Sequence, residues 1–153
     1  MEAINEILKV TNDWKLAAPQ EDVYCNELIR VYLKGKSDGM EQAQKLVLDK
    51  LQHNIEKSGK VASGIIRLLK DNGFYPISSY LKVENWNDFS IMILIPDKEW
   101  GQEQFLEMID KASDIETSAR DEYFNVMAVF CPVEDNFDEK CAISDGYLFK
   151  YAV

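Results

Sequence analysis

Cysteine and histidine are scarce in this chain. Its 153 residues include three cysteines and a single histidine, His53. No two cysteines have CxxC spacing and their number is odd, so we expect neither a disulfide framework nor a zinc site. Cys25 and Cys131 are expected as small buried apolar side chains, and Cys131 would form a redox pair with Cys141 only if a final hairpin joined them. His53 falls on the flank of a predicted helix, which favours a position at the solvent boundary over a catalytic base.

The usual signatures of phosphate binding and nucleophilic catalysis are also missing. The chain contains no GxGxxG and no GxSxG, and the loop between Gly35 and Gly39 lacks the spacing of a P-loop. The acidic segment 134–140 lacks the glycine and the terminal glutamate of a calcium-binding loop. The sequence therefore predicts no cofactor and no metal. It leaves open whether the chain is an enzyme and favours a non-catalytic protein.

Long apolar runs are absent as well. The longest run, Ile91 to Ile95, has the length of a strand and falls far below the ~18 residues of a membrane span. The segment MEAINEILKV has neither a basic start nor a long apolar stretch, so no secretory signal is predicted. Together with the unpaired cysteines, these features predict a cytoplasmic protein that binds no membrane.

Basic residues are outnumbered by acidic ones, and the imbalance lies in the carboxyl half. Residues 1–83 contain 11 acidic and 12 basic residues, whereas residues 84–153 contain 16 acidic and 5 basic residues, a net charge of −11. A surface this negative repels phosphate backbones, so nucleic acid is not an expected partner. The same charge would attract a basic protein, or would serve only to keep the protein in solution.

The spacing of apolar residues changes near position 73. Before it, apolar residues recur at helical spacing, and we expect a first helical segment from about residue 4 that Ala17-Ala18-Pro19 ends, followed by helices at 21–34, 40–57 and 61–70. The segment 21–34 is rich in β-branched residues, which makes a strand its alternative. Ser58-Gly59 is expected to end the third helix, and Asp71-Asn72-Gly73 is expected to end the fourth.

After position 73 the pattern is that of strands interrupted by one helix. We expect the helix at 101–120 and strands at 77–83, 89–95, 123–133 and 142–152. The almost continuous apolar run of the second strand predicts a strand that is covered on both faces, or at least a central one. The sequence therefore predicts one α+β domain over residues 1–153. A mainly helical N-terminal half, 1–73, is followed by a ββαββ part, 74–153, whose mostly antiparallel sheet has helices on one face.

Aromatic and acidic residues of the carboxyl half supply the candidate partner-binding residues. Two tryptophans stand in the turns that bound the apolar strand, and tryptophan is enriched at binding hot spots. Four acids lie at the start of that strand and in the acidic loop. The candidates are Trp86, Asp88, Trp100, Asp135, Asp138 and Glu139. The alternative is that the tryptophans pack in the core and that the acids are solvated turn residues.

Two functions from different classes fit these observations. The first is a non-catalytic intracellular binding or regulatory protein, with the role of an immunity protein, an antitoxin or an adaptor, whose acidic half engages a basic protein partner. The alternative is a small-molecule-binding protein or a hydrolase that uses a carboxylate, such as Asp88 or Asp121, in a cleft between helices and sheet. A homodimer through an exposed edge strand at Tyr147–Tyr151 is compatible with both.

Overall fold

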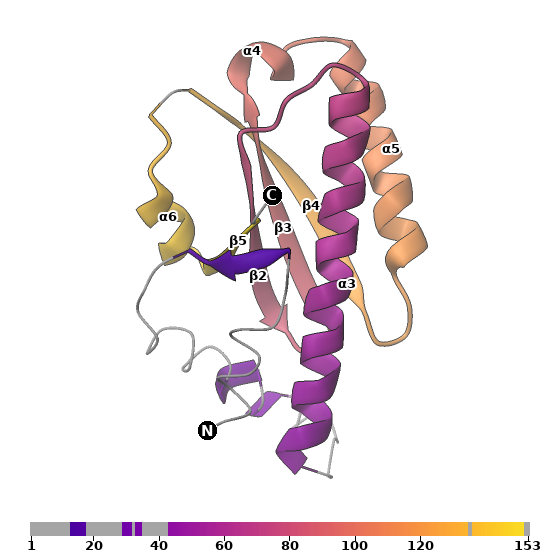
Figure 1. Ribbon diagram of the computed structural model, residues 1–153, viewed down its shortest axis with the longest axis vertical. Helices are drawn as coiled ribbons and strands as arrows, with labels where there is room; N and C mark the ends of the chain where they lie inside the picture. Colours follow the sequence, from indigo (N-terminus) through magenta and orange to yellow (C-terminus); the bar gives the residue numbers. More distant parts are fainter. Residues whose placement is uncertain (1–12, 18–28, 32, 35–42, 135, 152–153) are drawn as a thin grey trace.

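The computed structural model describes residues 13–17, 29–31, 33–34, 43–134 and 136–151, which combine helices with one sheet (Figure 1). Most of the predicted first helical segment lies outside these residues, but its described part is a strand at 14–16, so a helix there is wrong. The described part of 21–34 is helical. The fold is α+β, as predicted. In chain order the elements are β1 (Trp14–Leu16), α3 (Ala43–Asp71), β2 (Ser78–Asn85), β3 (Asp88–Pro96), α4 (Asp97–Trp100), α5 (Gln104–Ala119), β4 (Asn125–Val133), α6 (Glu139–Ser144) and β5 (Tyr147–Tyr151).

Helix α3 is one continuous helix of 29 residues, so the predicted break at Ser58-Gly59 is wrong. The Ser58 hydroxyl donates to the carbonyl of Ile55 at 2.6 Å and is thereby satisfied inside the helix. Gly59 lies where the segment around Asp13 passes close by, because a Cβ atom on Gly59 would stand 2.6 Å from Asp13 Oδ2. Gly59 therefore permits a close approach of the chain and does not end the helix.

The end of α3 is where the sequence predicts it. Gly73 follows the helix with a φ of +85°, a conformation that side chains other than glycine rarely adopt. The Gly73 N–H donates to the carbonyl of Lys70, and the Phe74 N–H donates to the carbonyl of Leu69 at 2.9 Å. This pair of bonds satisfies the last carbonyls of the helix and turns the chain toward β2. Among the described helices, none has the combination of length and apolar character that crossing a membrane requires.

The five described strands form one mixed sheet in the order β1-β5-β2-β3-β4. The pairs β1–β5, β5–β2 and β2–β3 are antiparallel, and β3–β4 is parallel. A parallel pair needs a crossover connection, which α4 and α5 supply. The apolar strand β3 lies between β2 and β4, so it is central, as its composition predicts. Strand β1, from the amino-terminal part, was not among the predicted strands.

The predicted second hairpin does not form. Strands β4 and β5 lie on opposite sides of the β2–β3 hairpin, with α6 between them in the chain. Strand β5 pairs with β1 and with β2, so Tyr147–Tyr151 is not the exposed edge that the sequence suggested. Without that hairpin nothing joins Cys131 to Cys141, and both are free thiols. Cys131 is half-buried where a buried residue was expected, and Cys25 lies outside the described residues.

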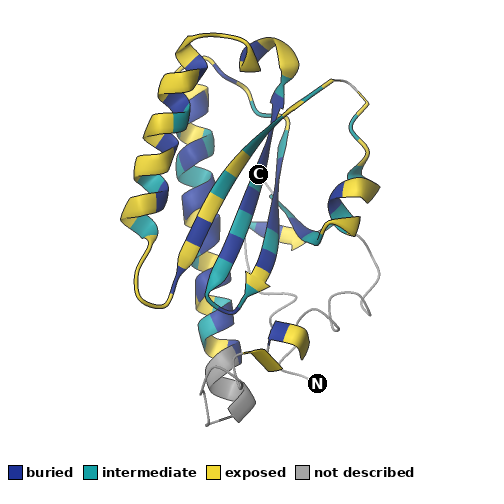
Figure 2. Ribbon diagram, turned by 180° about the vertical axis from the view of Figure 1, so that it is seen from behind, coloured by how far each residue is buried: buried dark blue, intermediate teal, exposed yellow. Residues whose placement is uncertain are grey.

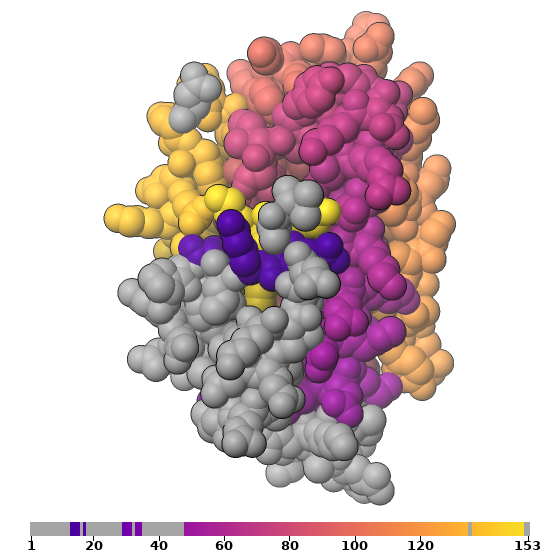
Figure 3. Space-filling model, in the orientation of Figure 1, coloured from indigo at the N-terminus to yellow at the C-terminus, as the bar shows by residue number. Residues whose placement is uncertain are grey.

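The main core lies between the sheet and two helices, α3 and α5, which run side by side along the molecule (Figures 1 and 3). The sides of these helices that face the sheet are buried and their outer sides are exposed (Figure 2). Fully or almost fully buried members of this core are Leu51, Ile55, Ile65 and Leu69 of α3, Phe105, Met108 and Ala112 of α5, and Leu81, Ile91, Ile93 and Val126 of the sheet.

The opposite face of the sheet is covered in part by the segment that contains α6. Tyr80 follows the alternation of β2 and lies on this face, because its neighbour Leu81 belongs to the main core. The Tyr80 ring centroid is 5.9 Å from that of Phe137. Helices therefore lie on both faces of the sheet, and the prediction of helices on one face holds only for α3 and α5.

Candidate functional site

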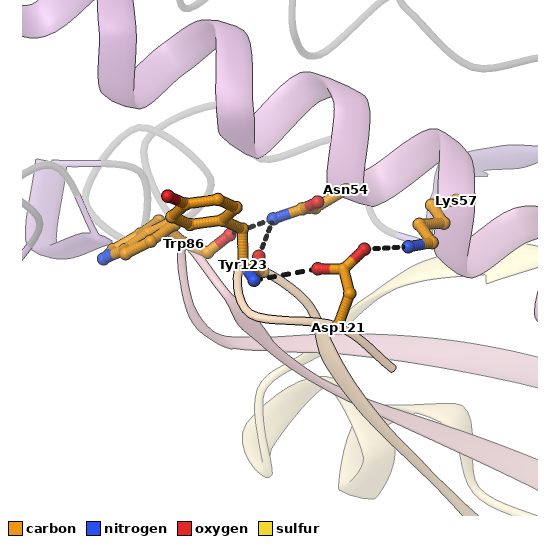
Figure 4. Close-up of polar contacts among 5 residues, drawn as sticks. All are labelled: Asn54, Lys57, Trp86, Asp121 and Tyr123. Carbon is orange, nitrogen blue, oxygen red and sulfur yellow. Dashed lines mark hydrogen bonds and ion pairs between the residues drawn. The ribbon is translucent and has the colours of Figure 1, made fainter. Parts of the chain in front are cut away.

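A buried asparagine joins α3 to two turns of the sheet (Figure 4). Asn54 is 3% exposed, and its Nδ2 donates to the carbonyl of Trp86 and to the carbonyl of Tyr123, both at 2.9 Å. Trp86 belongs to the β2–β3 turn and Tyr123 to the turn between α5 and β4. We call these three residues the turn clamp. A buried amide is stable only when it is hydrogen-bonded, so the turn clamp fixes both turns against the helix.

Asp121 fastens the second turn from its outer side. Its Oδ2 accepts from Lys57 Nζ at 2.5 Å, and its Oδ1 accepts from the Tyr123 N–H at 2.8 Å (Figure 4). The hydrogen bond from Lys57, followed by the Tyr123 N–H, lowers the pKa of Asp121 below its ordinary value. A lowered pKa makes this carboxylate a poor general acid and a weaker general base than an ordinary aspartate.

Lys50 and the aromatic rings complete this cluster. Lys50 Nζ lies 3.9 Å from the ring centroid of Tyr123 and 5.9 Å from that of Trp86. Such contacts attract an ammonium group to the face of a ring. A hollow of about 260 Å³ opens here, lined by Asp49, Lys50, His53, Asn54, Asp121 and Tyr123. His53 is exposed at its rim, as the sequence predicts.

A second polar cluster holds α6 on the opposite face of the sheet. The Tyr80 hydroxyl donates to Glu139 Oε2 at 2.6 Å, and Lys150 Nζ donates to the same oxygen at 3.2 Å. Burial, and then this hydrogen bond, raises the pKa of Tyr80. The bond from Tyr80 is the largest cause that lowers the pKa of Glu139. Burial alone would lower the pKa of Lys150, but its bond to Glu139 leaves that pKa raised.

The predicted partner-binding residues do not form one surface. Trp86 and Asp88 lie at the β2–β3 turn, where Trp86 is buried and Asp88 accepts from Asn125 Nδ2 at 2.8 Å. Trp100 lies beyond the other end of β3, a strand roughly 26 Å long, and its ring packs on Phe105.

The acidic-loop candidates lie beside α6. Asp138 caps this helix through a hydrogen bond from the Lys140 N–H at 3.0 Å, and the adjacent Glu139 is bonded to Tyr80. Asp135 lies outside the described residues. The structure therefore places Trp86 near Asp88, and Asp138 next to Glu139, but it does not join the two pairs. Asp88, Asp138 and Glu139 each make a hydrogen bond within the fold.

Two buried carboxylates were missed by the sequence analysis. Glu99 accepts from the Tyr75 N–H at 2.7 Å, and Glu116 accepts from the Ala128 N–H at 2.7 Å. Glu116 follows Phe105, Met108 and Ala112 on the buried side of α5. Its place on the apolar stripe was the signal that separates it from the exposed acids of the same helix.

Three exposed acids of α5, together with Glu103 at its N-cap, share the opposite side of the helix. Glu103, Glu107, Asp110 and Asp114 are all exposed, and within the described part of the chain none of them has an ion pair. Their spacing places them along one line that faces away from the sheet. We call these four residues the acidic stripe.

Nothing in the described residues is arranged as a metal centre. No group of three or more potential ligands among His, Cys, Asp and Glu comes together in the described ranges. A hollow of about 710 Å³ lies at the carboxyl ends of β3 and β4 and is lined by Ile77, Pro96, Asp97, Lys98, Val133, Glu134 and Asn136. These residues are exposed or half-buried, so the hollow is an open surface basin.

Comparison with known protein families, with curated proteins and with solved structures gives no significant match to this chain. Its function therefore has to be inferred from its own residues and their contacts.

Proposed function

We propose that this chain is a non-catalytic binding protein whose acidic carboxyl half engages a basic protein partner. The observation that carries the proposal is the acidic stripe of α5, which presents four carboxylates to solvent without ion pairs among the described residues. Charges left unpaired on one side of a helix attract a partner of the opposite sign and increase the rate of encounter.

Several other acids of this half have contacts within the fold. Glu99 and Glu116 are buried and bonded to backbone N–H groups, so they serve the fold. Asp121 and Glu139 are paired with lysines and fasten a turn and α6. The four residues of the acidic stripe, by contrast, make no such side-chain contact within the described structure.

Exposed apolar side chains next to the acidic stripe provide apolar surface that a bound partner would bury. Leu106 lies on α5 between the stripe residues and is 66% exposed, and Trp100 just before the helix is 38% exposed. An exposed leucine alone is ordinary, but apolar anchors surrounded by complementary charge are typical of binding surfaces. Of the partner-binding residues predicted from the sequence, the proposed interface therefore includes only Trp100. Its other residues are those of the acidic stripe and Leu106.

Charge reversal tests the proposal directly. The purified chain is used to capture proteins from the native cell, and the same capture is made with the double variant Glu107→Lys, Asp110→Lys. We expect a basic protein to be retained by the wild type, to be released by added salt, and to bind the variant at least roughly tenfold more weakly, because like charges then face each other.

The matched control changes the same net charge in the amino half. Glu56 and Asp71 are exposed on α3 and have no ion pair in the described structure, so Glu56→Lys, Asp71→Lys is the control variant. If the control variant weakens binding as much as the α5 variant does, the weakening is due to net charge alone and not to the position of the acids on α5. Binding that neither variant weakens would remove α5 as the interface.

The hollow beside Asp121 favours one second candidate, a protein that binds a small molecule or hydrolyses it. This hollow lies between α3 and a turn of the sheet and has Asp121, Asp49 and His53 at its wall. Binding would shift the imidazole proton signals of His53 in an NMR screen of small polar compounds, and Asp121→Asn would abolish the shifts. A screen without any shift would remove this candidate and leave the partner-binding proposal untouched.

A further inference from the structure

The outer edge of β4 has no neighbouring strand within the described part of the chain. β4 is last in the strand order, and among the described strands it pairs with β3 alone. Backbone groups alternate along a strand, so every second residue directs its N–H and C=O away from the neighbour. The contacts of Val126 and Ala128 with α5 show that the even-numbered residues face outward. Nine residues with such an edge are a template for adding another strand.

Two side chains from the end of α5 occupy this edge. Glu116 Oε1 accepts from the Ala128 N–H at 2.7 Å, and Arg120 Nε donates to the Val126 carbonyl at 3.1 Å. A second nitrogen of Arg120 lies 3.5 Å from the other oxygen of Glu116. The Glu116 carboxylate thus accepts one hydrogen bond from β4, and the Arg120 guanidinium donates another to it. An additional strand would make these same two kinds of bond with β4. Glu116 is only 8% exposed, so its carboxylate is committed to this contact.

We propose that Glu116 and Arg120 act as a substitute for a sixth strand and keep the edge of β4 closed to β4 of a second copy of this chain. An antiparallel pairing of two β4 strands about a two-fold axis at Ala128 would need the Ala128 N–H and the Val126 carbonyl of each copy. These are the groups that the side-chain pair holds. The closed edge keeps the chain from associating through its sheet.

A second copy is the occupant that fits this edge because β4 is self-complementary. Centred on Ala128, the antiparallel pairing sets Met127 of one copy opposite Val129 of the other. Both side chains lie on the face opposite α5 and are among the exposed large apolar residues, at 54% and 41%. Pro132 has no N–H to offer and limits the pairing to the centre of the strand. Glu122 and Glu134 near the ends of β4 would meet as like charges, a repulsion that salt screens.

Hydrogen exchange of the wild-type protein gives the first test. The N–H of Ala128 is bonded to Glu116, whereas that of Phe130 faces the same side and has no hydrogen-bond partner among the described residues. We expect the Ala128 amide to exchange roughly tenfold or more slowly than the Phe130 amide, after correction for sequence effects. Equal exchange rates at the two positions would overturn the proposal.

Removal of the side-chain pair gives the second test. In the double variant Glu116→Ala, Arg120→Ala we expect the Ala128 amide to exchange roughly tenfold faster at low protein concentration. In roughly 0.5 M NaCl at high protein concentration, sedimentation should then show a dimer that the wild type does not form. Adding Ala128→Pro should abolish the dimer, because it deletes an outward N–H and leaves the ladder with β3 intact.

The control pair is Glu107→Ala, Lys111→Ala. It removes an acid and a base with the same spacing from the exposed side of the same helix, and it should leave the chain monomeric. A folded Glu116→Ala, Arg120→Ala variant that stays monomeric, or a dimer that survives Ala128→Pro, would refute the proposal. If the double variant does not fold, Arg120→Ala alone, at a half-exposed site, and the wild-type exchange rates still decide the question.

Discussion

The two faces of the sheet differ in what covers them and in how each cover is held. One face lies under α3 and α5, and its central side chains Leu81, Ile91 and Ile93 are completely buried. On the other face, Tyr80 is buried beneath the α6 segment, but Met127 and Val129 are exposed. Packing fixes the first face, whereas a few polar contacts around Glu139 fix the second. The comparison shows that the fold depends mainly on one side of its sheet and leaves the other side partly open.

The largest expected effect is the loss of stability after a mutation in the covered face, compared with a mutation in the open face. Ile91→Ala removes a fully buried side chain from the central strand and should lower the free energy of unfolding by about 3–4 kcal/mol, since the helices above it close the cavity only partly. Val129→Ala on the open face should cost less than about 1 kcal/mol. Urea unfolding followed by circular dichroism measures both. Similar losses for the two variants would contradict the difference between the faces.

The turn clamp gives an effect of intermediate size. Asn54→Ala leaves the carbonyls of Trp86 and Tyr123 without their donor, and we expect a loss of about 2 kcal/mol in the free energy of unfolding. Asn72→Ala is the control, because Asn72 makes only an exposed hydrogen bond to the carbonyl of Leu68. A loss after Asn54→Ala no larger than after Asn72→Ala would show that the covered face is held by apolar packing alone.

Much of the fold could be predicted from the sequence because local patterns determine single elements. The apolar run of β3 indicates a central strand, the amphipathic spacing of α5 indicates its buried side, and Gly73 indicates where α3 ends. The pairing of β5 with β2 and the parallel pairing of β3 with β4 could not be predicted. These pairings join segments far apart in the chain, and the spacing of apolar residues within a strand does not identify the neighbouring strand.

The contacts of single polar residues were harder to predict. Ser58 and Gly59 have the composition of a helix end, but the neighbouring chain near Asp13 decides their structure. Nothing in the sequence around Asn54 predicts its contacts, because its hydrogen-bond partners are carbonyls of two distant turns. The burial of Glu116, in contrast, could be predicted from the sequence, since this residue continues the buried stripe of α5. An acid on an apolar stripe predicts a buried carboxylate, but the partner of that carboxylate is known only from the structure.

The smallest expected effect concerns the contact that holds α6 on the open face. Tyr80→Phe removes the hydroxyl that donates to Glu139 and keeps the ring in place, so we expect a loss of about 1 kcal/mol in the free energy of unfolding near neutral pH. The lowered pKa of Glu139 means that its carboxylate stabilises the fold above the ordinary value of 4.5, and that this contribution is lost as the pH falls through the folded-state pKa.

Because the bond from Tyr80 is the largest cause of that lowered pKa, the loss caused by Tyr80→Phe should shrink as the pH falls below 4.5. Unfolding measured near neutral pH and at about pH 3 gives both values. Tyr75→Phe is the matched control, since the Tyr75 ring is exposed and no hydrogen bond of its hydroxyl is present among the described residues. An effect of Tyr80→Phe that stays constant across this range would mean that ring packing against Phe137, and not the charge on Glu139, holds α6 to the sheet.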